Sequence, residues 1–182
     1  MKKRYILDEA QIGRTLTRIS HEILERNKGS QNLVLLGVKT RGEYLARRLK
    51  EKIESIDNGT VNIGTIDITN YRDDLGSANN RTTDALEVSA SLVDQHVVIV
   101  DDVLYTGRTI RAALDAILSH TRPDKISLAV LIDRGHRELP IRADYIGKNI
   151  PTSKHEKVVV HMSEVDKEDT VYISEEIENV TR

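Results

Sequence analysis

One segment of the chain identifies the class of fold: Val97-Val98-Ile99-Val100-Asp101-Asp102-Val103-Leu104-Tyr105-Thr106-Gly107-Arg108-Thr109. Its apolar start predicts a buried strand, and the two acids that follow mark the carboxyl end of that strand. Gly107 permits a close turn of the backbone, and Thr109 opens a stretch with helical periodicity. Ligands of open α/β sheets bind beyond the carboxyl ends of the strands. The segment therefore predicts a strand–turn–helix unit that also carries a ligand site.

The side chains of this segment suit a phosphorylated sugar. Asp101 and Asp102 would repel a bare phosphate, but they accept hydrogen bonds from ribose hydroxyls and can help to hold Mg²⁺. Thr106 and Thr109 offer hydroxyls, and the start of a helix offers free amides to a phosphate. This order of groups predicts a ribose-5-phosphate site. The alternative is a helix start with two capping acids. The chain has neither a P-loop pattern nor a Gly-x-Gly-x-x-Gly after a strand.

The rest of the chain alternates between apolar runs and stretches of helical period. Helices are expected at 8–27, 42–52 and 109–120, and strands at 33–36, 61–69, 97–100, 126–132, 158–160 and 171–173. A mobile loop is expected at 73–83, and the stretch 133–154 is rich in turns. Continuous apolar strands between helices predict an α/β fold, a mainly parallel sheet covered on both faces, in a single domain that spans 1–182.

Composition narrows the classes of function. The chain has 182 residues, 31% of them charged and 38% hydrophobic, which is typical of a globular protein. Its net charge is −2, so binding of nucleic acid requires a local basic patch. It has no cysteine, which excludes disulfides and thiolate metal sites, and neither Trp nor Phe, which disfavours base-stacking modules. The polar start and the lack of a long apolar run predict a cytoplasmic protein with no membrane partner.

A second basic turn follows the strand expected at 33–36. It reads Gly37-Val38-Lys39-Thr40-Arg41-Gly42. A parallel sheet should bring this turn close to the acids of the first segment, because both lie at carboxyl ends of strands. Lys39 and Arg41 are suited to neutralise a pyrophosphate group. Taken alone, the pattern also fits an ordinary basic turn.

The segment 97–109 resembles the phosphoribosyltransferase signature nearly residue for residue. The resemblance implies a type I phosphoribosyltransferase fold, with a mainly parallel sheet, flanking helices and a small hood. It implies that the paired acids bind ribose, that the turn binds the 5-phosphate, and that the whole segment contacts 5-phosphoribosyl-1-pyrophosphate (PRPP) or a nucleotide. The hood is expected to be formed by parts of the N-terminus and roughly by 133–182.

The resemblance also gives roles to the basic turn. Lys39, Thr40, Arg41 and Gly42 look like the family's pyrophosphate loop, which often carries a non-proline cis peptide. Arg72, which precedes the expected mobile loop, is expected to help hold pyrophosphate.

Further roles concern the base and the reaction. Asp133 and Arg134 follow the strand expected at 126–132, and the resemblance places them against the nucleobase. Asp101, Asp102 and Arg41 are the expected catalytic residues. Mg²⁺ is the expected cofactor, entering with PRPP and held by the two acids only indirectly, through ribose or water. No residue is identified as a general base.

A more extensive resemblance covers most of the chain. It is carried by the runs 6–9, 16–22, 25–29, 38–42, 66–75, 101–111 and 133–154, which all look like one family. This family is the bifunctional pyrimidine operon attenuation regulators and uracil phosphoribosyltransferases. Membership implies conversion of uracil and PRPP to UMP and diphosphate. It also implies binding to a hairpin in the leader of the pyrimidine operon mRNA, favoured by UMP or UTP, which promotes termination of transcription. A homodimer or higher homo-oligomer is expected.

The expected RNA contacts, carried over by resemblance, are Thr17, His21, Arg137, Arg142 and Lys148. Spacing supports part of this set, because Arg14, Thr17, Arg18 and His21 fall on one polar stripe of the first helix. Without the resemblance, a solvated helix face and a charged turn are the simpler interpretation.

Three other functions fit the same residues. One is a dedicated salvage phosphoribosyltransferase without RNA binding, and another is a nucleotide sensor that has lost catalysis. The third is a purine-specific transferase, because the shared signature does not name the base. The stretch 76–86 departs from the family pattern, with few positive charges and no proline, and bears on closure of the expected loop over the site.

Overall fold

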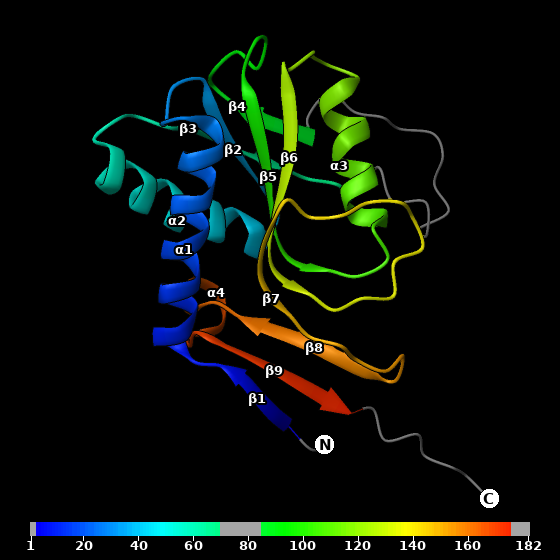
Figure 1. The fold of residues 1–182 in the computed structure, drawn as a ribbon. Helices are drawn as coiled ribbons and strands as arrows, with labels where there is room; N and C mark the ends of the chain where they lie inside the picture. The colour runs from blue at the N-terminus through cyan, green and yellow to red at the C-terminus, as the bar shows by residue number, and fades with distance from the viewer. Residues whose placement is uncertain (1–2, 70–84, 176–182) are drawn as a thin grey trace, which may run out of the picture.

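A six-stranded sheet forms the centre of the molecule (Figure 1). The computed structural model describes residues 3–69 and 85–175. In chain order the strands are β2 (Leu33–Val38), β3 (Asn62–Ile66), β4 (Leu86–Val88), β5 (His96–Leu104), β6 (Lys125–Asp133) and β7 (Tyr145–Asn149). Their spatial order is β4-β3-β2-β5-β6-β7, and every pair is parallel except β3–β4. The predicted mainly parallel α/β sheet is therefore confirmed.

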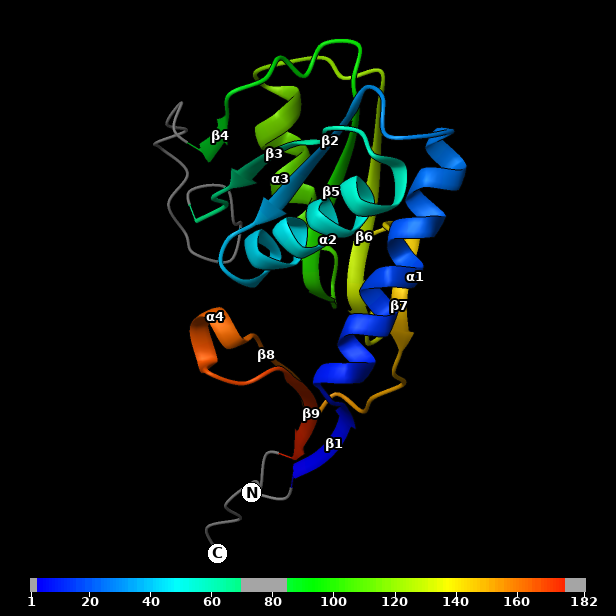
Figure 2. The same cartoon turned by 90° about the vertical axis from the view of Figure 1, so that its left-hand side faces the viewer.

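Helices cover both faces of this sheet. The helices α1 (Glu9–Asn27) and α2 (Arg41–Asp57) pack on one face, and α3 (Arg108–Leu118) packs on the other (Figures 1 and 2). Asp8 caps α1 through a capping box with Gln11, as its position in the sequence predicts. The apolar residues of α1 that recur at helical spacing are buried: Ile12, Leu16, Ile19 and Ile23.

A second, smaller sheet lies beyond the carboxyl ends of the large sheet (Figure 1). It consists of β1 (Lys3–Leu7), β8 (Glu156–His161) and β9 (Thr170–Glu175) in the antiparallel order β1-β9-β8. The short helix α4 (Ser163–Asp166) connects β8 to β9. Apolar side chains of this sheet continue the core under α1, among them Leu7, Val158, Val160, Val171 and Ile173.

Three strands were not expected from the sequence. β1 and β4 are short, and most of their residues are at least partly exposed, so neither shows a buried apolar run. β7 lies inside 133–154, which its turn residues had marked as irregular. Within the described part of the chain it is an edge strand that pairs only with β6, and it has one buried residue, Tyr145. Part of 133–182 thus belongs to the large sheet, while β8 and β9 pair with β1 in the small one.

Among residues 3–69 and 85–175, no helix has the length and apolar character needed to cross a membrane.

Candidate functional site

The loops predicted to carry the site meet at one edge of the large sheet. β2 pairs with β5 and β5 pairs with β6, so the turns that follow these strands are neighbours. Gly42 shows how close they are. A Cβ at this position would lie 2.4 Å from the backbone oxygen of Val100 and 3.2 Å from the Cα of Asp101. Only glycine fits there, and the predicted proximity of the basic turn to the acids is confirmed.

The two acids at the end of β5 differ in environment. Asp101 is buried, whereas Asp102 is half-buried. Oδ1 of Asp101 accepts a hydrogen bond from the amide of Asp102 at 2.9 Å, and Oδ1 of Asp102 accepts one from the amide of Val103 at 2.8 Å. Burial, and then the negative charge of Asp102, raise the pKa of Asp101 well above the usual range of a carboxyl. The pair therefore combines one carboxyl that resists ionisation with one that solvent reaches.

The turn after β5 surrounds an open space. Gly107 has a φ of 93°, in the left-handed region, and stands at the N-cap of α3. Because glycine has no side chain, it cannot cap the first amides of the helix, which suits them to an anion. A cavity of about 380 Å³ lies here, lined by the segment from Val103 to Ile110 and by Glu138. The amide of Arg108 donates to Thr106 Oγ1 at 3.3 Å, a long hydrogen bond that a phosphate oxygen can replace. The turn thus has the shape and the amide donors that a phosphate group needs.

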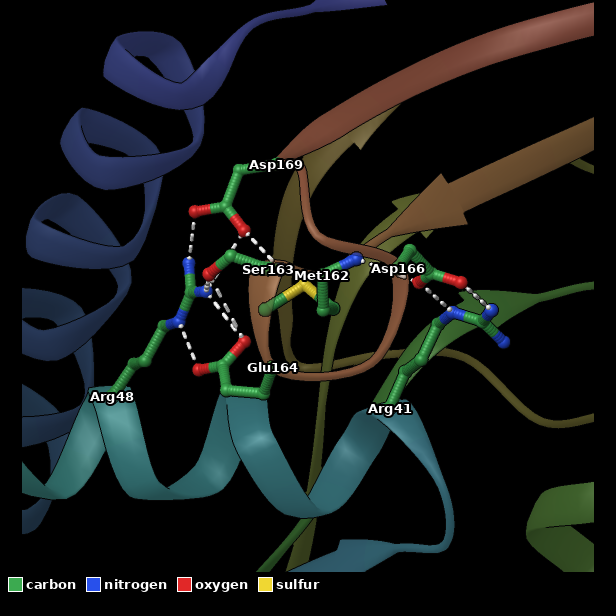
Figure 3. Close-up of polar contacts among 7 residues, drawn as sticks. All are labelled: Arg41, Arg48, Met162, Ser163, Glu164, Asp166 and Asp169. Carbon is green, nitrogen blue, oxygen red and sulfur yellow. Dashed lines mark hydrogen bonds and ion pairs between the residues drawn. The ribbon is translucent and has the colours of Figure 1, made fainter.

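The cations of the basic turn are both paired with acids from distant segments. Lys39 Nζ lies 3.0 Å from Glu87 Oε1 on β4, and this hydrogen bond raises the pKa of Lys39. Arg41 donates from Nε and Nη2 to Asp166 at 3.1 and 2.8 Å (Figure 3). The Lys39–Thr40 peptide bond is cis. Arg72, expected to join these residues, lies outside the described residues.

The end of β6 carries the two residues expected to face a base. Arg134 is buried, and its guanidinium lies 3.9 Å from the ring centroid of Tyr105. It donates to Thr152 Oγ1 at 3.2 Å and to the backbone oxygens of Ser153 and Glu156 at 3.3 and 2.7 Å. Arg134 therefore connects the phosphate turn to the chain that leads into β8, a role that the sequence pattern did not reveal.

The neighbouring Asp133 is also buried. Its Oδ1 accepts the Gly135 amide at 3.0 Å, and its backbone oxygen accepts the Ile150 amide at 2.9 Å. These bonds fix the turn that leaves β6 beside the phosphate turn.

The polar side chains predicted to lie along α1 contact two different elements. Thr17 is half-buried, and its Oγ1 lies 3.0 Å from Lys52 Nζ on α2. Arg18 turns the other way and donates to the backbone oxygens of Ile146 and Gly147 on β7, at 3.1 and 2.7 Å. His21 is exposed. The stripe therefore contacts α2 at Thr17 and β7 at Arg18, and its end at His21 is open to solvent.

The remaining RNA candidates lie between β6 and β7 and on β7 itself. Arg137, Arg142 and Lys148 are all exposed. Lys148 follows Gly147, which packs against α1, so alternation along the strand places Lys148 on the opposite face of the sheet. The cations of this region and the residues of α1 thus flank the β7 edge from two sides.

Hydrogen bonds join the connection between β6 and β7 to the phosphate turn. The backbone oxygen of Thr106 accepts the amides of Glu138 and Leu139 at 2.9 and 3.2 Å. Arg108 donates from Nε and Nη2 to Glu138 Oε2 at 3.1 and 3.0 Å. Glu138 was not singled out from the sequence, because the pairing depends on a contact across 30 residues.

Comparisons with known proteins agree with this geometry. Residues 4–166 match the phosphoribosyl transferase domain family. The chain is 62% identical to the Bifunctional protein PyrR of Staphylococcus haemolyticus over 174 residues, which covers 95% of this chain and 99% of the relative. It is 61% identical to the Bifunctional protein PyrR of Macrococcus caseolyticus over 173 residues, with the same shares covered.

Solved structures of lower identity share the fold. The hypoxanthine phosphoribosyltransferase of Trypanosoma cruzi superposes with a TM-score of 0.72 at 21% identity, covering 96% of this chain and 97% of that one. A hypoxanthine phosphoribosyltransferase from Staphylococcus aureus gives a TM-score of 0.68 at 19% identity, covering 98% and 94%. Together with the paired acids and the phosphate turn, these matches show that the chain belongs to the phosphoribosyltransferase family and, within it, to the PyrR proteins.

Proposed function

We propose that this protein is an RNA-binding attenuation regulator of the pyrimidine biosynthesis operon that also forms UMP and diphosphate from uracil and PRPP. The observation that carries the proposal is the match at 62% identity, over 95% of the chain, to a protein named Bifunctional protein PyrR. The site supports it, because an acid pair, a phosphate turn and a basic turn meet at one sheet edge.

The transferase activity uses this edge. Asp101 and Asp102 bind the ribose hydroxyls, and the turn 105–109 binds the 5-phosphate at the start of α3. Asp133 and Arg134 form the side of the site next to the base.

The basic turn acts on the leaving group. Lys39, Thr40, Arg41 and Gly42, joined by Arg72, hold the diphosphate. The bond from ribose C1 to the leaving oxygen breaks through a cation-like transition state. Lys39 and Arg41 offset the negative charge that develops on the departing diphosphate. To do so, Lys39 leaves its ion pair with Glu87 and binds the diphosphate instead.

Magnesium enters this site with PRPP. The described part of the chain has no group of three or more His, Asp or Glu residues placed to hold a metal by itself. Two adjacent carboxylates, with oxygen ligands of the kind that Mg²⁺ prefers, do fit an ion that brings other ligands from its substrate. Asp101 and Asp102 would hold the ion only indirectly, through ribose hydroxyls or water, and the bound ion would offset negative charge on the diphosphate.

The RNA-binding activity uses a local basic region, as a chain of net charge −2 requires. Arg137, Arg142 and Lys148 are exposed cations near the β7 edge, and Thr17 and His21 supply polar contacts from α1. A leader hairpin offers phosphates and unstacked base edges to such groups. A homodimer or higher homo-oligomer in the cytoplasm brings two of these surfaces together.

Bound uridine nucleotide and RNA are coupled through the phosphate turn. Its Thr106 oxygen accepts two amides of the segment that carries Arg137 and Arg142. UMP bound at the turn therefore stabilises the segment in the form that binds RNA, and termination follows.

Filter binding tests the proposal. The purified protein is mixed with a leader hairpin of its own pyrimidine operon, with and without UMP, at fixed salt and Mg²⁺. We expect tight binding that UMP strengthens, and loss of that binding in Arg137→Ala while uracil transfer survives. Binding no tighter than to a scrambled hairpin would contradict the regulator and leave a dedicated salvage transferase.

A further inference from the structure

Two arginines of α2 attach the connection between β8 and β9, residues 162–169, here called the α4 segment, to this helix (Figure 3). Arg48 binds Asp169 at 2.6 and 2.8 Å and Glu164 at 2.9 and 2.7 Å. Arg41, at the start of the same helix, binds Asp166. Arg48 lines a pocket together with Glu9 and Gly13 of α1, whereas Arg41 belongs to the basic turn of the candidate site. Both ion pairs therefore join an arginine of α2 to an aspartate of the same connection, but only that of Arg41 lies at the candidate site.

The pairing of Arg41 leaves part of its guanidinium available. Asp166 occupies Nε and Nη2, a side-on geometry that uses both carboxylate oxygens. In Figure 3 the third nitrogen of Arg41 points away from Asp166. Among the described residues, Nη1 has no hydrogen-bond partner. Asp102 lies near enough for its charge to contribute to the raised pKa of Arg41, after Asp166 as the main cause. The next residue, Gly42, packs against the backbone of Val100 and Asp101, so the unoccupied end of Arg41 is available to an anionic group of a ligand bound at this sheet edge.

Asp166 is itself firmly held. Its Oδ2 accepts the amide of Met162 at 2.9 Å, and its side chain is only 16% exposed. The hydrogen bond from Arg41 is the main cause of its lowered pKa, so the carboxylate is charged at neutral pH. A charged carboxylate cannot bind diphosphate directly, because the two would repel each other. Its effect on such a ligand has to pass through Arg41.

We propose that Asp166 is a positioning residue of the transferase site, which holds Arg41 side-on so that its free end meets the diphosphate group of PRPP. This inference rests on the proposed function of the basic turn. It assigns a role in substrate binding to the small sheet, which contributes Asp166 from a position 125 residues away from Arg41. A flexible arginine without this partner would lose side-chain entropy on binding, and a held one has already lost it.

Calorimetric titration with PRPP and Mg²⁺, without uracil, measures the effect directly. We expect Asp166→Asn to weaken PRPP binding about tenfold, because the arginine is no longer fixed in a productive geometry. Affinity for UMP, which carries no diphosphate, should be unchanged. In uracil transfer the same variant should raise the KM for PRPP more than it lowers kcat. Asp166→Glu, which keeps the charge, should recover part of the affinity.

Asp169→Asn is the matched control. Asp169 also pairs with an arginine of α2, and its Oδ1 also accepts a backbone amide of the α4 segment, that of Ser163 at 2.6 Å. This variant should lower the melting temperature at least as much as Asp166→Asn and leave PRPP affinity unchanged. Equal loss of PRPP affinity in both variants would show that attachment of α4, not the placement of Arg41, is what matters, and would overturn the proposal.

Unchanged or tighter PRPP binding by Asp166→Asn would overturn it as well, since tighter binding would mean that Asp166 competes with the substrate for Arg41. The outcome is separable from that of the proposed function. A wild-type protein that binds PRPP but forms no UMP from uracil contradicts the enzymatic half of that function, while the titration still decides the role of Asp166.

Discussion

The backbone oxygen of Thr106 accepts the amide of Glu138 at 2.9 Å, which joins the phosphate turn to the segment that carries Arg137. The side chain of Glu138 adds a second link, because its Oε2 accepts two hydrogen bonds from Arg108. These side chains are 44% and 55% exposed, so their ion pair contributes little to stability. Its position between a nucleotide site and an RNA surface suggests that it matters for coupling instead.

Glu138→Gln should reduce the enhancement of RNA binding by UMP severalfold, because the charged link between turn and segment is lost. RNA binding without nucleotide should be slightly tighter, since an acid beside Arg137 is removed. Filter binding with and without UMP checks both effects, and Glu51→Gln, an exposed acid on α2, is the control. An undiminished UMP effect would show that the backbone bonds of Thr106 suffice for the coupling.

Gly107→Ala should impair nucleotide binding and stability together. The φ of 93° lies where a Cβ is disfavoured, at a cost of about 1–2 kcal/mol. The new methyl would lie 3.4 and 3.5 Å from the Cβ atoms of Leu139 and Ile141, which is ordinary van der Waals contact, so the cost comes from the backbone conformation. Urea unfolding and UMP titration measure the two effects. Wild-type UMP affinity in this variant would count against the turn as the phosphate site.

Arg134→Ala should lower the free energy of unfolding by about 3 kcal/mol, because it removes several hydrogen bonds and a cation–π contact from a buried position. The exposed Arg142, changed to Ala, should alter stability by no more than about 0.5 kcal/mol. Chemical denaturation compares the two variants. A small effect at Arg134 would favour a direct contact with the base over the structural role seen here.

The sequence predicted those parts of the fold that have a local signal. The run 97–100 of continuous apolar residues lies in the first half of β5, and the capping box of Asp8 and Gln11 starts α1. Edge strands such as β7 were missed, because a strand with one neighbour and one buried residue has no continuous apolar run.

The site also has a part that is visible in the sequence and a part that is not. The acids, the phosphate turn and the basic turn are contiguous motifs and could be found in sequence. Their partners Glu87, Glu138 and Asp166 could not, since each contact depends on how distant segments fold together. Arg134 shows what position in the sequence leaves out. It stands at the predicted edge, and the sequence did not reveal that its guanidinium also donates to the chain that leads into β8.

The free energy of unfolding should depend on pH because the Asp101 carboxyl has a raised pKa in the folded chain. Burial and Asp102 raise the pKa of this carboxyl in the folded chain, whereas in the unfolded chain it is about 3.9. Between these values the folded chain binds a proton that the unfolded chain has released. The free energy of unfolding therefore falls as pH rises from about 4 through the folded pKa.

Asp101→Asn has no such proton to release. Its free energy of unfolding, relative to the wild type, should grow with pH across this range by up to about 1.4 kcal/mol per pH unit, while PRPP binding weakens because a ribose ligand is lost. Urea unfolding at a series of pH values from about 4 to 8 measures the difference. Asp94→Asn, in the exposed turn before β5, controls for the loss of one carboxylate. A stability difference at position 101 that does not change with pH would mean that the folded chain ionises this carboxyl as easily as the unfolded chain does, and that the acid pair is open to water before substrate binds.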